Sequence, residues 1–148
     1  MRELLLYLDA SALVKLVLPE KESQFLRKSL ESWPARVSSE LARVEVIRAA
    51  RRAAMDPAVE QRAHQVAAGL HLLKIDGELL DQAAALEPRK LGSLDALHLA
   101  TALSLGADLG AIATYDAALA TAAAGLGVVV LAPGKETAGI TGPSEDTD

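Results

Sequence analysis

Hydrophobic residues in this chain occur in short continuous runs that alternate with segments of helical periodicity. The run 4–8 (LLLYL) is apolar throughout and too short to span a membrane, so it predicts a buried strand. It stops at Asp9, and a helical pattern begins within two residues, with Ser11 as the expected N-cap. A carboxylate therefore follows a buried strand, which is where open α/β sheets bind ligands. The alternative is that Asp9 only caps the helix.

The same alternation continues along the chain. Further strands are expected at 35–38, 70–75, 110–115 and 127–131, and further helices at 22–32, about 40–55, 57–69, 77–87, 94–102 and 117–124. The pattern predicts an α/β protein, a three-layer αβα sandwich with a short, mainly parallel central sheet. We expect one domain over residues 1–132 and a disordered acidic tail over 133–148, because the tail has little to bury.

Two more acids occupy positions like that of Asp9. Asp116 also follows a strand and precedes a helix, and Asp95 lies in the first turn of a helix that Ser93 is expected to cap. Each acid alone is explained by capping or by the helix dipole. Because the carboxyl ends of parallel strands meet at one edge, three acids converging there are harder to explain as caps.

The helix expected over 40–55 carries the fourth acid of interest. Glu45 is predicted to lie at the edge of the apolar stripe, whereas Glu40 lies in the first turn, where the dipole favours any acid. The stripe is predicted to consist of Leu41, Val44 and Ile47. Arginines cover another face of the helix, at Arg43, Arg48, Arg51 and Arg52. This face is interpreted first as a solvated surface, and an RNA-binding track is the alternative.

The three histidines are interpreted as packing or surface residues. His98 follows Asp95 by three residues and shares its helix face, so the pair could in principle bind a metal ion. Two ligands without a third nearby are a weak signal, and packing is the preferred interpretation for His98.

A cluster of four carboxylates has a definite chemical meaning. Carboxylates that lie so close together raise one another's pKa values, unless a cation lies among them. Oxygen ligands of this kind suit Mg²⁺ or Mn²⁺, which can activate water and stabilise charge on a phosphodiester. Hydroxyls of Ser11 and Thr114 could orient a carboxylate or the metal's waters. The residues thus point to metal-dependent phosphodiester hydrolysis.

Composition narrows the function further. The 148 residues carry a net charge of −5, and three of the acids lie in the last six positions. A chain that is not basic is unlike the proteins that bind nucleic acid non-specifically through its phosphates, so tight binding of that kind is disfavoured. A small acidic site that grips phosphate through a metal ion remains compatible. Without cysteine, thiolate chemistry and zinc–thiolate sites are excluded. No membrane span or targeting signal is apparent, so a soluble cytoplasmic protein is expected.

Other acidic or phosphate-binding folds do not fit. A receiver domain needs adjacent acids after its first strand, and a phosphatase of the haloacid-dehalogenase type needs Asp-x-Asp, but this chain has Asp9-Ala10-Ser11. The glycine-rich loop of dinucleotide-binding proteins and the Gly-Lys-Ser/Thr of P-loop enzymes are both missing.

Four segments carry a family resemblance. The segments YLDASALVKL, SSELARVEVIRA, LGSLDALHLATAL and IATYDAALATAAAGLGV resemble the signature segments of PIN-domain proteins, and more narrowly the VapC toxins of bacterial VapBC toxin–antitoxin systems. The resemblance extends from Leu4 to about Leu131. It places the family's four acids on Asp9, Glu45, Asp95 and Asp116, and its small hydroxyl residues on Ser11 and Thr114.

The resemblance implies a Mg²⁺- or Mn²⁺-dependent endoribonuclease whose catalytic residues are these four acids, with the three aspartates as metal ligands. It also implies a homodimer that cleaves tRNA or rRNA and is inhibited by a cognate VapB-like antitoxin. Arg43 and Arg48 are the candidate RNA contacts. The alternative is a PIN-fold module that binds RNA or protein without cutting, and the two readings differ in whether EDTA-sensitive cleavage occurs.

Overall fold

A parallel sheet forms the centre of the molecule in the computed structural model, which describes residues 3–135. The strands pair in the order β3-β2-β1-β4-β5, and every neighbouring pair is parallel. Their bounds are Leu5–Leu8 (β1), Arg36–Ser39 (β2), His71–Leu73 (β3), Leu109–Ala113 (β4) and Val130–Leu131 (β5).

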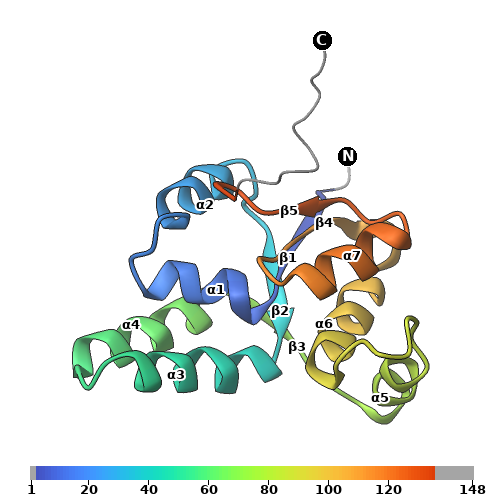
Figure 1. The fold of residues 1–148 in the computed structure, drawn as a ribbon. Coiled ribbons are helices and arrows are strands. Elements are labelled where there is room, and N and C mark those ends of the chain that lie inside the picture. The colour runs from blue at the N-terminus through green and yellow to red at the C-terminus, as the bar shows by residue number, and fades with distance from the viewer. Residues whose placement is uncertain (1–2, 136–148) are drawn as a thin grey trace.

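Helices cover both faces of this sheet (Figure 1). Helices α1 to α4 lie on one face, and α6 and α7 on the other, with α5 packed on α6. Their bounds are Ala10–Val17 (α1), Ser23–Leu30 (α2), Leu41–Ala53 (α3), Pro57–Ala68 (α4), Gly77–Ala84 (α5), Ser93–Leu103 (α6) and Ala117–Gly125 (α7), and a 3₁₀ turn spans Gly106–Asp108. The predicted three-layer αβα architecture with a parallel sheet is confirmed.

The central strand β1 supplies side chains to both helical layers. Leu6 and Leu8 pack among the helices α1 to α4, whereas Tyr7 packs with α6 and α7 on the other face. This alternation follows from the two-residue period of a strand. All three side chains are essentially inaccessible to solvent, and burying each leucine contributes about 1.5–3 kcal/mol. The apolar run therefore fixes the strand between the two layers.

Helix α3 turns a different face to the core than the sequence pattern predicted. Its buried residues are Ala42, Val46 and Ala50, whereas Val44 of the predicted stripe is 59% exposed. Leu41 and Ile47 are only partly buried. Small alanines let α3 pack closely against α1 and α4, and this close packing outweighs the greater hydrophobicity of the predicted stripe. Glu45 still lies at the edge of the buried face.

Two predicted helix caps are also wrong. Asp9, not Ser11, is the N-cap of α1, because its carboxylate reaches the amide of Ala12. Gly92, not Ser93, precedes α6, and it provides no side-chain hydrogen bond. Asp56 and Asp76 cap the starts of α4 and α5 through hydrogen bonds from the backbone amides of Ala58 and Leu79.

Several other elements are shorter than expected; the strand expected over 127–131, for example, spans only Val130–Leu131. The helix expected over 77–87 ends at Ala84, and the strand expected to reach Tyr115 ends at Ala113. The predicted tail falls largely on residues 136–148, which lie outside the described residues, so its disorder and the boundary at residue 132 stay predictions. None of the helices in the described chain is long and apolar enough to cross a membrane.

A tight contact occurs near the amino end of β4. The indole of Trp33, which follows α2, lies directly against the backbone of Gly110. A β-carbon at position 110 would come within 2.6 Å of the indole ring and 2.9 Å of the Leu4 side chain. Glycine is therefore required for this close approach.

Candidate active site

The acids gather where the order of strands reverses. From β1 the chain adds β2 and β3 on one side, and then returns to add β4 and β5 on the other. The switch point therefore lies between β1 and β4, and the crevice outside the carboxyl ends of two such strands is the usual ligand site of an open α/β sheet. Asp9 directly follows β1, and Thr114, Tyr115 and Asp116 follow β4.

Asp9 is held rigidly at this point. Only 3% of the residue is exposed, and Oδ1 accepts hydrogen bonds from the Ser11 hydroxyl at 2.7 Å and the Ala12 amide at 3.0 Å. Oδ2 accepts a hydrogen bond from the Thr114 hydroxyl at 2.6 Å. Burial raises the pKa of the Asp9 carboxyl, and the hydrogen bonds from Thr114, Ser11 and Ala12 oppose that rise. Asp9 both caps α1 and occupies the site, so its two interpretations are compatible.

The two predicted hydroxyl residues tie the ends of β1 and β4 together. Besides donating to Asp9, Ser11 accepts a hydrogen bond from the Tyr115 amide at 2.8 Å. Thr114 likewise accepts one from the Asp116 amide at 3.0 Å. These hydroxyls orient the backbone as well as the carboxylate, and Ser11 does so from inside α1 instead of capping it.

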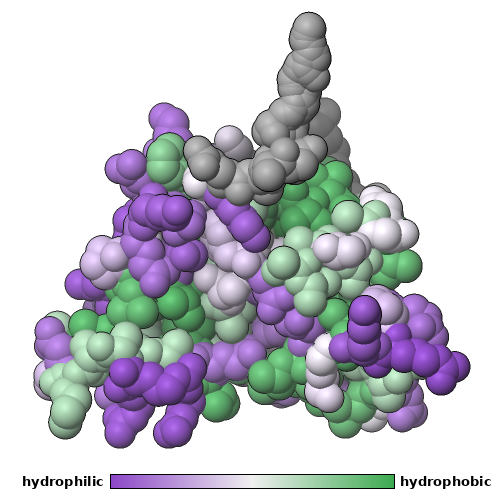
Figure 2. All heavy atoms as spheres, viewed as in Figure 1, coloured by the Kyte–Doolittle hydropathy of each residue, from purple (hydrophilic) through white to green (hydrophobic). Residues whose placement is uncertain are grey.

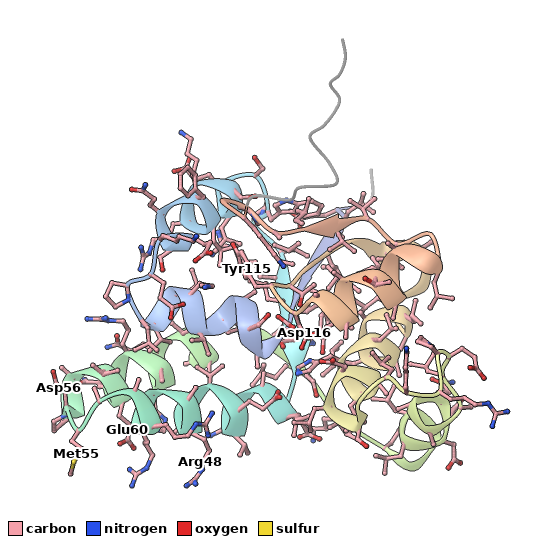
Figure 3. The ribbon with its side chains drawn as sticks, viewed as in Figure 1. Arg48, Met55, Asp56, Glu60, Tyr115 and Asp116 are labelled. Carbon is pink, nitrogen blue, oxygen red and sulfur yellow. The ribbon has the colours of Figure 1, made fainter. Side chains whose placement is uncertain are left out.

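Asp95 and Asp116 complete a group of three close carboxylates. Asp116 is the N-cap of α7, and its Oδ1 accepts from the Leu119 amide at 3.0 Å; Figure 3 shows it between α1 and α7. Burial, then the charges of Asp116 and Asp9 and contact with Asp116, raise the pKa of Asp95 to about 6. The structure thus brings three predicted acids together so closely that their charges repel.

Glu45 approaches the same region from α3 through a histidine. Oε1 of Glu45 lies 2.7 Å from Nε2 of His98, and Nδ1 of His98 lies 2.7 Å from the hydroxyl of Tyr7. His98 is only 2% exposed, and it lies close enough to Asp9 and Asp95 that a protonated imidazole would lower the pKa of both. His98 is buried, as expected of a packing residue, but sequence reasoning missed its bond to Glu45. The face that His98 shares with Asp95 indicated only that His98 lies near the acids, not which acid it binds.

The chemistry of the donors suits a hard divalent cation. The three aspartates offer only oxygen atoms. After burial, the charges of Asp116 and Asp9 are the next causes of the raised pKa of Asp95, and a cation would neutralise them. Within residues 3–135, however, no three acidic or histidine side chains already stand in a metal-binding arrangement. The type and charge of these ligands therefore suit Mg²⁺ or Mn²⁺, but the side chains of the described residues are not yet arranged to coordinate the ion.

Exposed arginines extend along α3 beyond Glu45. Arg48 and Arg52 follow Glu45 by three and seven residues and so share its side of the helix, and neither forms an ion pair with another described residue. Arg51 is paired with Glu60 at 2.9 Å, towards the far end of the helix (Figure 3). Arg43 is exposed but lies on a different side from Glu45. Figure 2 shows hydrophilic side chains along the lower edge of α3.

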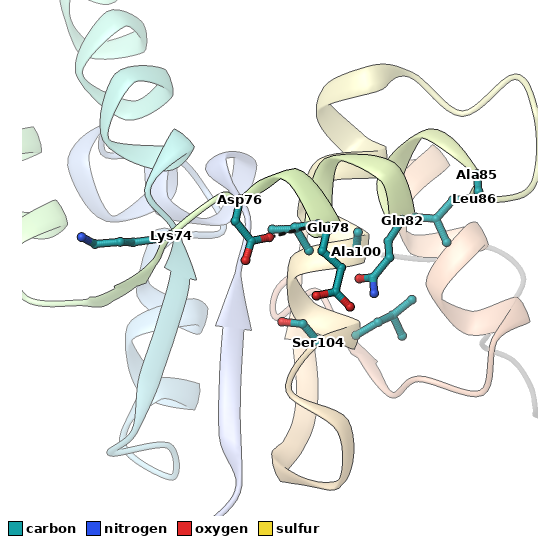
Figure 4. Close-up of a pocket in the computed structure, with 10 residues that line it drawn as sticks. Lys74, Asp76, Glu78, Gln82, Ala85, Leu86, Ala100 and Ser104 are labelled. Atoms are coloured by element: carbon teal, nitrogen blue, oxygen red, sulfur yellow. Dashed lines mark hydrogen bonds between the residues drawn. The ribbon is translucent and has the colours of Figure 1, made fainter.

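A separate cavity of about 720 Å³ lies beside α5 and α6 (Figure 4). Its wall from α6 is formed by the second half of that helix, at Ala100, Leu103 and Ser104, whereas Asp95 lies in the first turn. Asp76, which also lines the cavity, is occupied as the cap of α5 through the Leu79 amide. The cavity is therefore distinct from the acidic site.

Comparison with known proteins agrees with this geometry. The PIN domain matches residues 6–125. Ribonuclease VapC46 of Mycobacterium tuberculosis is 47% identical over 130 residues, which cover 86% of this chain and 97% of that protein. Ribonuclease VapC35 of the same organism is 41% identical over 138 residues, covering 88% of this chain and 98% of that protein.

Solved structures show the same fold. The crystal structure of Mycobacterium tuberculosis VapC20, described as a Sarcin-Ricin loop cleaving toxin, superposes with a TM-score of 0.68 at 16% identity, covering 86% of this chain and 99% of that one. A toxin-antitoxin complex from Klebsiella pneumoniae gives a TM-score of 0.65 at 25% identity, covering 86% and 96%. With a PIN-domain match over most of its length, this chain belongs to the PIN-domain family.

Proposed function

We propose that this protein is a metal-dependent endoribonuclease that acts as the toxin of a type II toxin–antitoxin pair. The observation that carries the proposal is the convergence of Asp9, Asp95 and Asp116 at the switch point, with Glu45 linked to the same region through His98. Relatives that bear the name ribonuclease and match nearly their full length support the activity. All four acids of the predicted site are present, which favours an enzyme over a non-cleaving binding module.

In this proposal the acids have separate roles. Asp9, Asp95 and Asp116 would hold Mg²⁺ or Mn²⁺, which when bound supplies neutralisation of the carboxylates and stabilisation of charge on the phosphodiester. Ser11 and Thr114 keep Asp9 oriented through their hydrogen bonds. Glu45 is the group placed to accept a proton from the attacking water, because His98 binds only one of its two oxygens.

RNA would be held next to the acids by cationic side chains. Arg48 is exposed, unpaired within the described chain and one turn along α3 from Glu45, so it is placed to bind a backbone phosphate. Arg43 is exposed too, but it lies on a different side of α3 from Glu45, so its contribution to RNA binding should be smaller. A local basic strip of this kind reconciles RNA binding with the net charge of −5.

The proposed partners follow from the same assignment. We expect a structured RNA, tRNA or rRNA, as the substrate, a VapB-like antitoxin as the inhibitor, and a homodimer in the cytoplasm as the active form. The structural likeness to a chain from a toxin-antitoxin complex supports the antitoxin partner.

The test is cleavage of total tRNA and rRNA with Mg²⁺ or Mn²⁺, comparing the wild type with an identically purified Asp9→Asn variant. Asparagine can still cap α1, so the variant should fold. Discrete fragments produced by the wild type alone, and abolished by EDTA, would support the proposal. Identical fragments from both proteins would assign the cutting to a contaminant, and RNA binding without any cutting would favour the binding module.

A further inference from the structure

We propose that His98 is a positioning residue for Glu45, at the centre of a buried relay that runs from Tyr7 through His98 to Glu45. The relay joins three elements, because Tyr7 belongs to β1, His98 to α6 and Glu45 to α3. The inference rests on the proposed function only in so far as Glu45 acts on the substrate. The hydrogen-bond chain itself is a separate claim.

With a neutral imidazole at His98, the chemistry of the three groups assigns a direction to both bonds. An ionised carboxylate only accepts hydrogen bonds, so Nε2 of His98 must carry the hydrogen that lies between it and Glu45. In the neutral imidazole Nδ1 is then an acceptor, and the Tyr7 hydroxyl donates to it. Burial raises the pKa of Tyr7 well above its usual value, so this hydroxyl keeps its hydrogen.

Two neighbouring hydroxyls have their own hydrogens engaged elsewhere. Ser38 and Thr101 both approach the Tyr7 hydroxyl. Ser38 donates its own hydrogen to the Leu8 carbonyl at 2.5 Å, and Thr101 donates to the Leu97 carbonyl at 2.6 Å. Neither neighbour has a hydrogen left to donate to Tyr7, and Nδ1 of a neutral His98, 2.7 Å away, is an acceptor for the Tyr7 hydroxyl.

The consequence falls on Glu45. Its side chain is 18% exposed, and fixing a glutamate in one rotamer costs side-chain entropy that a bond must offset. Tyr7 and His98 are themselves held in the core, at 0% and 2% exposure. The bond from His98 therefore holds Oε1 of Glu45 in place, and Oε2, which has no hydrogen bond within the described chain, is left for the reaction.

Nitrogen NMR of the imidazole rings tests the relay without requiring cleavage. The chain has three histidines, and His64 and His71 are exposed, which makes them internal references. At neutral pH we expect His98 to show a protonated Nε2 and an unprotonated Nδ1, and Tyr7→Phe to shift the Nδ1 resonance. Protonation of Nδ1, or rapid averaging of tautomers like that of an exposed histidine, would overturn the proposal.

Two substitutions test the positioning role on an RNA that the wild type cleaves. His98→Leu removes the donor to Glu45 and should lower kcat about 10- to 100-fold, the usual cost of losing a group that orients a catalytic residue, with KM little changed. His98→Gln supplies an amide N–H and should restore most of the rate. Equal losses in both variants, matched to their losses of melting temperature, would make His98 merely structural. If the wild type cuts no RNA, the proposed function fails while the NMR result still decides the relay.

Discussion

The Thr114 hydroxyl donates a 2.6 Å hydrogen bond to Oδ2 of Asp9, and so joins the ends of β1 and β4. Both residues are buried, with Thr114 0% and Asp9 3% exposed. A carboxylate in such a place is stable only when its oxygens are satisfied by donors. The bond therefore holds the first acid of the proposed site and also the central strand pair of the sheet.

Replacing Thr114 by valine, which has nearly the same shape, should destabilise the fold. Oδ2 of Asp9 would lose its donor in a buried position, and we expect the free energy of unfolding at pH 7 to fall by about 1–3 kcal/mol. Thr114→Ser keeps the hydroxyl and should lose much less. Urea denaturation of the three proteins measures the difference, and equal stability of the valine variant would mean that Asp9 finds another donor.

Asp95 should make the metal-free protein less stable as the pH rises. Its pKa is about 6 in the folded state and 3.8 in the reference state, so between these values the folded protein binds more protons. Stability is therefore lost as pH rises from about 4 to about 6, by an amount on the order of 1 kcal/mol because the group is partly exposed. In EDTA, Asp95→Asn should remove this slope from a plot of melting temperature against pH, and should abolish cleavage when metal is restored. A slope that persists in the variant would place its origin elsewhere.

Substitutions of Asp116 should distinguish its role as a helix cap from the role of its charge. Asp116→Asn can still accept from the Leu119 amide, so α7 should keep its cap while RNA cleavage is lost. Asp116→Ala removes the cap as well and should cost about 1 kcal/mol more in unfolding free energy. Thermal melts and RNA cleavage of both variants give the answer. Full activity in the asparagine variant would remove Asp116 from the catalytic set.

Arg48 should contribute to RNA affinity through charge. We expect Arg48→Glu to weaken binding of a tRNA mixture in EDTA and to reduce the dependence of log affinity on log salt concentration by about one unit. The matched control is Lys28→Glu, the same reversal of charge on α2, at a side chain that is 81% exposed and already adjacent to Glu31. Unchanged affinity and salt dependence in the Arg48 variant would leave α3 as an ordinary solvated face.

Much of the fold could be predicted because local signals agreed. The apolar run ending at Asp9 and the Asp56-Pro57 start of α4 each combine a hydrophobic pattern with a cap, and the structure has a strand and a helix there. The buried face of α3 could not be predicted in this way. Alanine contributes little to a hydrophobic pattern, but it decides which side of a helix can come closest to its neighbours.

The candidate site shows the same division. Asp9 and Asp116 were predicted because each follows a strand and precedes a helix, and Asp95 because it opens a helix and matches the family's signature segment. The two hydrogen-bond partners of His98 could not be predicted from the sequence, since Glu45 is 53 residues away and Tyr7 is 91 residues away. Such contacts depend on how β1, α3 and α6 are arranged in space, and no periodicity along the chain encodes that arrangement directly.

Trp33 gives the molecule a built-in optical reporter of its global fold. It is the chain's single tryptophan, and its indole rests on Gly110 near the amino end of β4, whereas the acids gather at the carboxyl ends of the strands. Its fluorescence should respond when the sheet comes apart and stay silent when a carboxylate is exchanged at the other end. Emission spectra alone will therefore tell a variant that has lost its chemistry from one that has lost its structure.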